Sequence, residues 1–227
     1  MGSPEQHLFE RGAIYRAKEA FDALRDHFDP SERLIYFQHA VSIYDSMQGW
    51  FFHVESARRR IRTWDVGLGP YSGPIPFEKI AEVAPLVRAA ESGDVSEVGR
   101  LAAARRTDHP IVRVAMDAAI DHGRASTAAT LIATGKLSPQ FQKRALSDAA
   151  RAKALDVTRA LLDAGVPASP KAIWPAVWSG SLEVVELLIE RGADVAKAEQ
   201  SISTMIAFCE RQNHLRLAEL LRGLSER

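Results

Sequence analysis

The chain has 227 residues and carries 29 acidic and 29 basic side chains, so its formal net charge is zero. This balance gives no general attraction to nucleic acid or to an anionic membrane, and we expect neither as a partner. The length allows one large domain or two ordinary ones.

Cysteine usage and hydropathy indicate the compartment. Cys209 is the only cysteine, which excludes an intrachain disulfide and is typical of a reducing environment. No apolar run reaches the roughly 18 residues of a membrane helix, and residues 1–25 lack the pattern of a signal peptide. We therefore expect a cytoplasmic protein.

The first third of the chain is predicted to be a small helical module over residues 1–62. Apolar residues between Phe9 and Phe28 recur three or four positions apart, as on one face of a helix. Asp29-Pro30 supplies an N-cap and a first-turn proline for a second helix. A third helix is expected over residues 50–62, with the basic run Arg58 to Arg62 at its C-terminal end.

The segment that follows is predicted to be a connector. Residues 63–76 contain three glycines and three prolines, so neither a helix nor a paired strand is expected there. Residues 77–82 are read as a short helix leading into the next domain. The aromatic residues are concentrated in this region, because 13 of the 17 lie between Phe9 and Phe77, and the sequence of residues 1–76 resembles no family known to us.

From Ala84 onward the chain aligns with itself at periods of 27 to 33 residues. Residues 84–93, APLVRAAESG, and residues 179–195, SGSLEVVELLIERGADV, resemble the two halves of an ankyrin repeat. The resemblance extends over about residues 84–224 and implies about five repeats. The predicted fold is therefore all-α, an ankyrin-repeat solenoid over residues 77–227 preceded by the helical module.

Two columns of the repeat carry the packing. One apolar residue of each first helix should point into the stack, and the residue three positions later should be small, so that the two helices approach closely. The apolar column is Leu86, Met116, Leu146, Ile173 and Ile206, and the small column is Ala89, Ala119, Ala149, Ala176 and Cys209. Shortened spacing after Gly135 and Gly165 predicts that two finger hairpins are truncated.

No pattern of catalytic or metal-binding residues emerges. The seven histidines lack metal-ligand spacing, and Asp108-His109 and Asp121-His122 lie where loop or helix-end polar residues are ordinary. Cys209 falls in the small column and is interpreted as a packed thiol. We expect no enzyme activity, no cofactor and no metal.

The resemblance implies that the first helices form a concave face that binds protein. The columns on that face also contain Ala118 and Pro175. Our candidate partner-binding residues are Arg88, Glu91, Asp121, Asp148, Arg151, Trp174, Trp178, Phe208 and Arg211. Trp178 is expected to be the anchor, since tryptophan and arginine dominate interface energetics. The alternative is that Trp174 and Trp178 pack against the shortened loop near Pro167 and Pro170.

The resulting hypothesis is a non-catalytic protein, monomeric alone, that recognises one protein partner. A narrower form of it is a bacterial immunity or antitoxin-type inhibitor whose partner is a toxin or effector. The alternative is an effector or enzyme whose N-terminal module carries the activity and whose repeats select the substrate.

Overall fold

The structure is a computed structural model that describes residues 9–23, 26–41, 46–53, 61–68 and 74–225. The chain divides into two compact units. The first contains residues 1–88 and 109–115, and the second contains residues 89–108 and 116–227.

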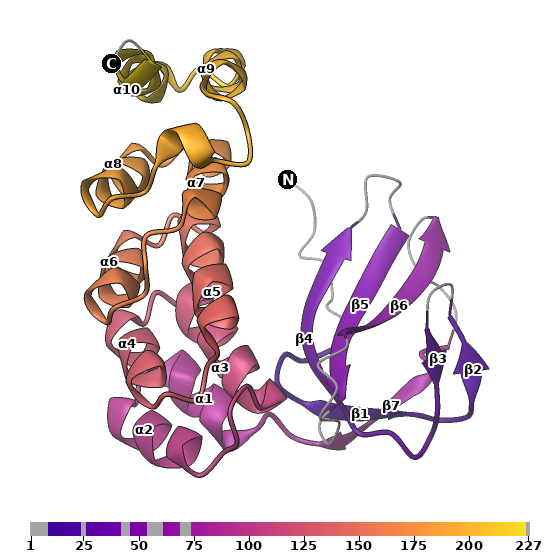
Figure 1. The fold of residues 1–227 in the computed structure, drawn as a ribbon. Coiled ribbons are helices and arrows are strands. Elements are labelled where there is room, and N and C mark those ends of the chain that lie inside the picture. The colour runs from indigo at the N-terminus through magenta and orange to yellow at the C-terminus, as the bar shows by residue number, and fades with distance from the viewer. Residues whose placement is uncertain (1–8, 24–25, 42–45, 54–60, 69–73, 226–227) are drawn as a thin grey trace. The chain divides into compact units, whose positions relative to one another are not determined.

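The first unit is built on β-strands rather than helices (Figure 1). Its strands are β1 (Ile14–Ala17), β2 (Phe21–Asp22), β3 (His27–Phe28), β4 (Leu34–Val41), β5 (Ser46–His53), β6 (Ile61–Leu68) and β7 (Phe77–Ala81). Five of them form an antiparallel sheet in the order β6-β5-β4-β1-β7, and β2 and β3 form a separate hairpin.

The prediction of an all-α fold with a helical N-terminal module is therefore wrong. Strand β1 lies inside the first expected helix, β4 inside the second and β5 overlaps the third. The expected connector, residues 63–76, contains most of β6, and the expected short helix at residues 77–82 is β7. The apolar spacing had indicated helices. In the structure, however, the four consecutive residues 34–37 are all buried, and a helix that buries one face cannot bury four residues in a row.

Phe77 of β7 lies at the centre of an aromatic core. The rings of Phe9, Phe21, Phe28 and Trp64 lie with their centroids 5.1 to 5.7 Å from that of Phe77, each in an edge-to-face arrangement. Aromatic residues are enriched in β-strands, so their concentration in residues 9–77 could have predicted strands in this part of the sequence. The contacts of Phe77 make β7 part of the sheet unit rather than of the repeats.

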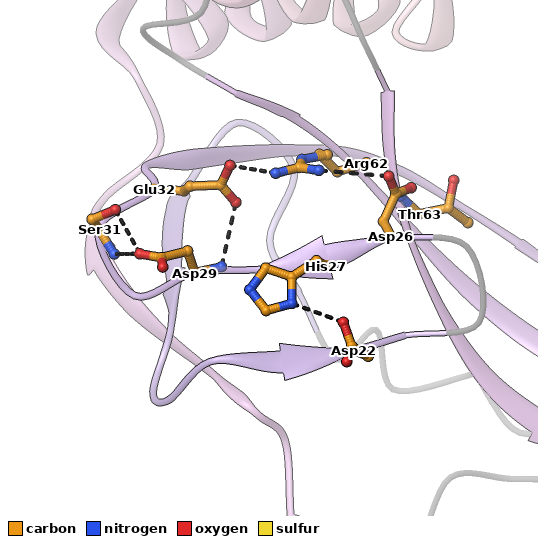
Figure 2. A network of polar contacts seen from close by, with 8 residues as sticks. All are labelled: Asp22, Asp26, His27, Asp29, Ser31, Glu32, Arg62 and Thr63. Carbon is orange, nitrogen blue, oxygen red and sulfur yellow. Dashed lines mark hydrogen bonds and ion pairs between the residues drawn. The ribbon is translucent and has the colours of Figure 1, made fainter.

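A buried ion-pair network joins the β3–β4 turn to β6 (Figure 2). The Arg62 guanidinium forms ion pairs with Glu32 and, at 3.6 Å, with Asp26. Asp26 also accepts a hydrogen bond from the backbone N–H of Thr63 at 2.9 Å. The Arg62 and Glu32 side chains are only 18% and 16% exposed, so Arg62 neutralises two carboxylates that water reaches poorly.

Replacing Arg62 by methionine should destabilise the first unit by about 3 kcal/mol, because two poorly hydrated carboxylates lose their counter-charge. Urea unfolding followed by near-ultraviolet circular dichroism, which reports the aromatic core, measures the change. Arg16→Met is the matched control, since Arg16 pairs with Glu78 on the exposed surface and should cost about 1 kcal/mol or less. Equal losses in the two variants would show that the network adds nothing beyond a surface ion pair.

The ten helices of the described residues form five consecutive hairpins. The first helices are α1 (Pro85–Ser92), α3 (Pro110–Asp121), α5 (Pro139–Arg151), α7 (Ile173–Ser179) and α9 (Ile202–Arg211). The second helices are α2 (Val95–Ala103), α4 (Ala125–Ala133), α6 (Leu155–Asp163), α8 (Leu182–Glu190) and α10 (Leu215–Ser225). Helices α4, α6 and α8 stack in one row, and α5, α7 and α9 in another (Figure 1).

The predicted packing columns are buried, with one exception. All five small residues, Ala89, Ala119, Ala149, Ala176 and Cys209, are at most 7% exposed, and the first four apolar residues are at most 1% exposed. In the fifth hairpin Ile206 is half-buried, and Met205 beside it is fully buried instead. The buried apolar position of the fifth hairpin is therefore shifted by one residue from the predicted column.

The connectors between hairpins contain no β-strand anywhere in residues 82–225. Short 3-10 turns, η1 (Pro170–Ala172) and η2 (Val195–Lys197), precede α7 and α9. The hairpins are therefore joined by loops and short 3-10 turns, including after Gly135 and Gly165, where truncated fingers were predicted.

Each first helix is followed, within two residues of its last residue, by a residue with a left-handed backbone. These residues are Gly93, Gly123, Lys153, Gly180 and Asn213, with φ between 56° and 85°. At Gly180 a second constraint applies, because a Cβ there would overlap with the ring of His214 from the next hairpin. At Gly123 a Cβ would meet no atom within 4 Å.

Gly123→Ala should cost about 1 kcal/mol, the strain of a left-handed alanine. Gly180→Ala should cost about 2 to 3 kcal/mol, because it adds the overlap with His214. Urea unfolding of both variants, repeated in a His214→Ala background, separates the two causes. Without the imidazole ring, the cost at position 180 should drop to that at position 123; an unchanged cost would contradict the contact.

Candidate protein-binding face

Three consecutive first helices present equivalent exposed positions. Arg151 of α5, Trp178 of α7 and Arg211 of α9 each lie two residues before the left-handed residue that follows the helix, and all three are exposed. Helix α7 contacts both α5 and α9, so the three side chains form a row across adjacent hairpins. We call this row, with its neighbours Asp148, Trp174 and Phe208, the first-helix face.

Trp178 is the most exposed aromatic side chain described, at 56%. Five of the seven residues of α7 are buried, so the helix is held firmly while Trp178 projects from it. The alternative that Trp178 packs against the shortened loop does not hold, because no loop covers most of its surface. A large apolar side chain is thus presented to solvent from a rigid helix.

Trp174 has a different environment. Its ring lies 5.2 Å from that of Phe208, edge to face, and both side chains are half-buried. This pair joins α7 to α9 and stabilises the contact between two hairpins. Trp174 therefore contributes to packing as well as to the surface beside Trp178.

Asp148 is held between two arginines of its own helix. Its Oδ2 lies 3.2 Å from Arg144 Nε, and its Oδ1 lies 3.4 Å from Arg151 Nη1. Burial raises the pKa of the Asp148 carboxyl, and the two guanidiniums only partly offset this effect. Arg144 was missed in the sequence, although its spacing of four residues from Asp148 on a helix predicts such a pair.

The other candidate residues lie outside this row. Arg88 belongs to the first unit and forms an ion pair there with Glu82 at 3.6 Å. Glu91 and Asp121 occupy the equivalent positions on α1 and α3, two residues before Gly93 and Gly123; Glu91 is half-buried and Asp121 exposed.

Two residues of the expected columns are excluded from any contact surface. Ala118 and Pro175 are buried. The alignment of a residue within the repeat was therefore not sufficient to predict whether its side chain is exposed or buried.

Two of the residues considered for chemistry, Asp108 and Cys209, lie in structural positions. The Asp108 carboxylate accepts a hydrogen bond from the backbone N–H of Ser138 at 2.8 Å, and its own N–H donates to the Lys136 carbonyl at 2.6 Å, which ties two connectors together. Cys209 is fully buried, and burial raises the pKa of its thiol.

Among the described residues no group of three or more His, Cys, Asp or Glu side chains is arranged to hold a metal ion. Within the same residues, no helix combines the length and hydropathy of a membrane span.

Comparison with solved structures gives a match to an ankyrin repeat domain. The chain is similar to the ankyrin repeat domain of Bcl-3, described as a unique member of the IkappaB protein family, with a TM-score of 0.50 and 26% sequence identity. The match covers 61% of this chain and 70% of that one. No protein-family model and no curated protein matches the sequence.

This likeness supports an ankyrin-repeat fold and a general role in protein–protein interaction. Ankyrin stacks are typically interaction scaffolds rather than catalysts. Among the side chains that the structure describes, the exposed aromatic residue is Trp178 of the first-helix face.

Replacing Asp148 by asparagine should change how stability depends on pH. Because the pKa of Asp148 is raised on folding, the stability associated with its protonated form is present at low pH and is lost as pH rises through the folded pKa. The free energy of unfolding of Asp148→Asn, minus that of the native chain, should therefore grow with pH.

Urea unfolding between about pH 3 and 7 measures this difference. Asp156→Asn, at an exposed position of α6, is the control, because it shows how much the stability changes with pH when an exposed carboxylate is removed. A difference that shrinks as pH rises would mean that the arginine pairs outweigh burial.

Proposed function

We propose that this chain is a non-catalytic recognition protein that binds one protein partner through the first-helix face. The observation that carries the proposal is the 56% exposure of Trp178 on a helix that is otherwise mostly buried. Leaving a large apolar surface in water forgoes the free energy of burying it, and such surfaces are commonly sites of interaction.

The surroundings of Trp178 suit a protein epitope. Arg151 and Arg211 occupy equivalent positions on the two neighbouring helices, and Trp174 and Phe208 add aromatic surface beside it. A central aromatic anchor bordered by polar groups is the usual anatomy of a protein interface. The helices hold these side chains in place before binding, which lowers the entropic cost of association.

Trp178→Ala should weaken binding of the partner by about 2 kcal/mol, or about thirtyfold in Kd, because the anchor is lost. Its melting temperature should change little, since the side chain is mostly exposed. The partner is captured with the native chain from the source cells, purified, and titrated against each variant by calorimetry.

The matched control is Leu215→Ala. Leu215 is 57% exposed, as Trp178 is, but it lies at the start of α10, outside the first-helix face. A captured protein that binds Leu215→Ala normally and Trp178→Ala weakly supports the proposal. Equal binding to the two variants would place the interface elsewhere.

We propose more narrowly that the partner is a toxin or effector that this chain inhibits, as an immunity protein does. The support is a neutral sequence without a catalytic motif and the exposed Trp178 on the first-helix face. Adding the purified chain to the captured partner should suppress the partner's activity in equimolar amount; full activity of the complex would refute the inhibitory role.

A further inference from the structure

The neutral chain separates its charge between the two rows of helices in the last three hairpins. The first helices α5, α7 and α9, with the turn η1, carry five basic and two acidic side chains, a net charge of +3. The second helices α6, α8 and α10 carry three basic and six acidic side chains, a net charge of −3. Within the first-helix face itself, Arg151 and Arg211 outnumber the single carboxylate of Asp148, so the face is positive although the chain as a whole is neutral.

The two acidic side chains of the first-helix row are already engaged. Asp148 pairs with Arg144 and Arg151, and Glu210 pairs with Arg222 of α10. The basic side chains Lys143, Lys171 and Arg211 are exposed, and none forms an ion pair within the described residues. Arg211 of the first-helix face, and Lys143 and Lys171 of the same row of helices outside it, are consequently available to a partner.

We propose that the partner segment recognised by the first-helix face is acidic and carries one large apolar side chain. The apolar side chain would cover Trp178, and flanking aspartate or glutamate residues would pair with Arg151 and Arg211 in the equivalent positions on either side. This inference rests on the proposed function and specifies the chemistry of its partner. Complementary charge of this kind orients a partner and speeds its association.

A second copy of the chain is a poorer fit. Helix α8 has an acidic ridge of Glu183, Glu186 and Glu190, all exposed. The large apolar side chains exposed among the described residues, however, are Ile80, Val95, Trp178 and Leu215, and none of them lies on α8. The ridge would supply charge but no cover for Trp178.

Nucleic acid is also a poorer fit. Binding to a phosphate backbone requires a broad basic surface, whereas the first-helix face has two exposed arginines, Arg151 and Arg211, and the Asp148 carboxylate lies beside Arg151. The second-helix row beside it carries the opposite net charge. The observations favour a short acidic protein segment.

The test is a selection of random twelve-residue peptides displayed on phage against the full chain at low salt. We expect enriched peptides to combine Asp or Glu with one Trp, Phe or Leu. A synthetic peptide of the enriched sequence, labelled with a fluorophore, is then titrated by fluorescence polarisation. Its Kd should rise at least tenfold for the double variant Arg151→Glu/Arg211→Glu and with increasing NaCl.

Two further variants sharpen the result. Arg159→Glu is the matched control, because Arg159 is exposed on α6, in the acidic row, and its reversal should leave the Kd unchanged. Asp148→Asn should lower the Kd severalfold, since it releases Arg144 and Arg151 from their carboxylate.

The outcomes separate this inference from the proposed function. Enriched peptides that are neutral or basic but still depend on Trp178 overturn the acidic partner and leave the binding face intact. Acidic peptides that bind Trp178→Ala as tightly as the native chain overturn the proposed face itself. Failure to enrich any peptide, tighter binding of a 20-base-pair DNA duplex, or self-association that Arg151→Glu/Arg211→Glu abolishes in sedimentation would each overturn the acidic-segment inference.

Discussion

A left-handed residue follows the first helix of every hairpin, and the rest of the helical unit depends on this turn. It reverses the chain so that the second helix packs back on the first. Four residues before the turn lies the small side chain, such as Ala176, that lets the two helices approach. Two residues before it lies a position on nearly the opposite side of the helix, because each residue advances the helix by about 100°. The same turn therefore buries Ala176 and exposes Trp178.

The charged side chains are also divided between the first and second helices of a hairpin. Helices α7 and α8 are joined by the turn at Gly180, yet α7 has no charged side chain and α8 has three glutamates and no basic residue. Adjacent basic residues come from η1, α5 and α9, so an overall charge of zero conceals a positive row and a negative row. Net charge describes solubility and long-range attraction, whereas the local separation of charge decides which partner segment can approach a given face.

The first unit is stabilised by a different arrangement, in which both ends of the segment contribute to one core. Phe9 precedes the first strand and Phe77 begins the last, and their rings lie 5.7 Å apart. The backbone N–H of Ala84, in the same unit, also donates a hydrogen bond to the Gly12 carbonyl at 3.0 Å. Arg62 adds the charge that allows Asp26 and Glu32 to be buried near β6.

The sequence by itself determined the helical hairpins of residues 84–225 and the small column at their core. Each hairpin is made by local residues, and repetition reinforced a pattern that one copy would leave uncertain. The sheet was decided only by tertiary structure, because its strands pair between residues far apart in the sequence, such as Arg16 and Glu78. The local spacing of apolar residues in these strands resembled that of a helix. The exposure of single side chains was decided there too. Trp174 and Trp178 are one helical turn apart and chemically identical, but the ring of Phe208 lies against Trp174, whereas Trp178 is exposed.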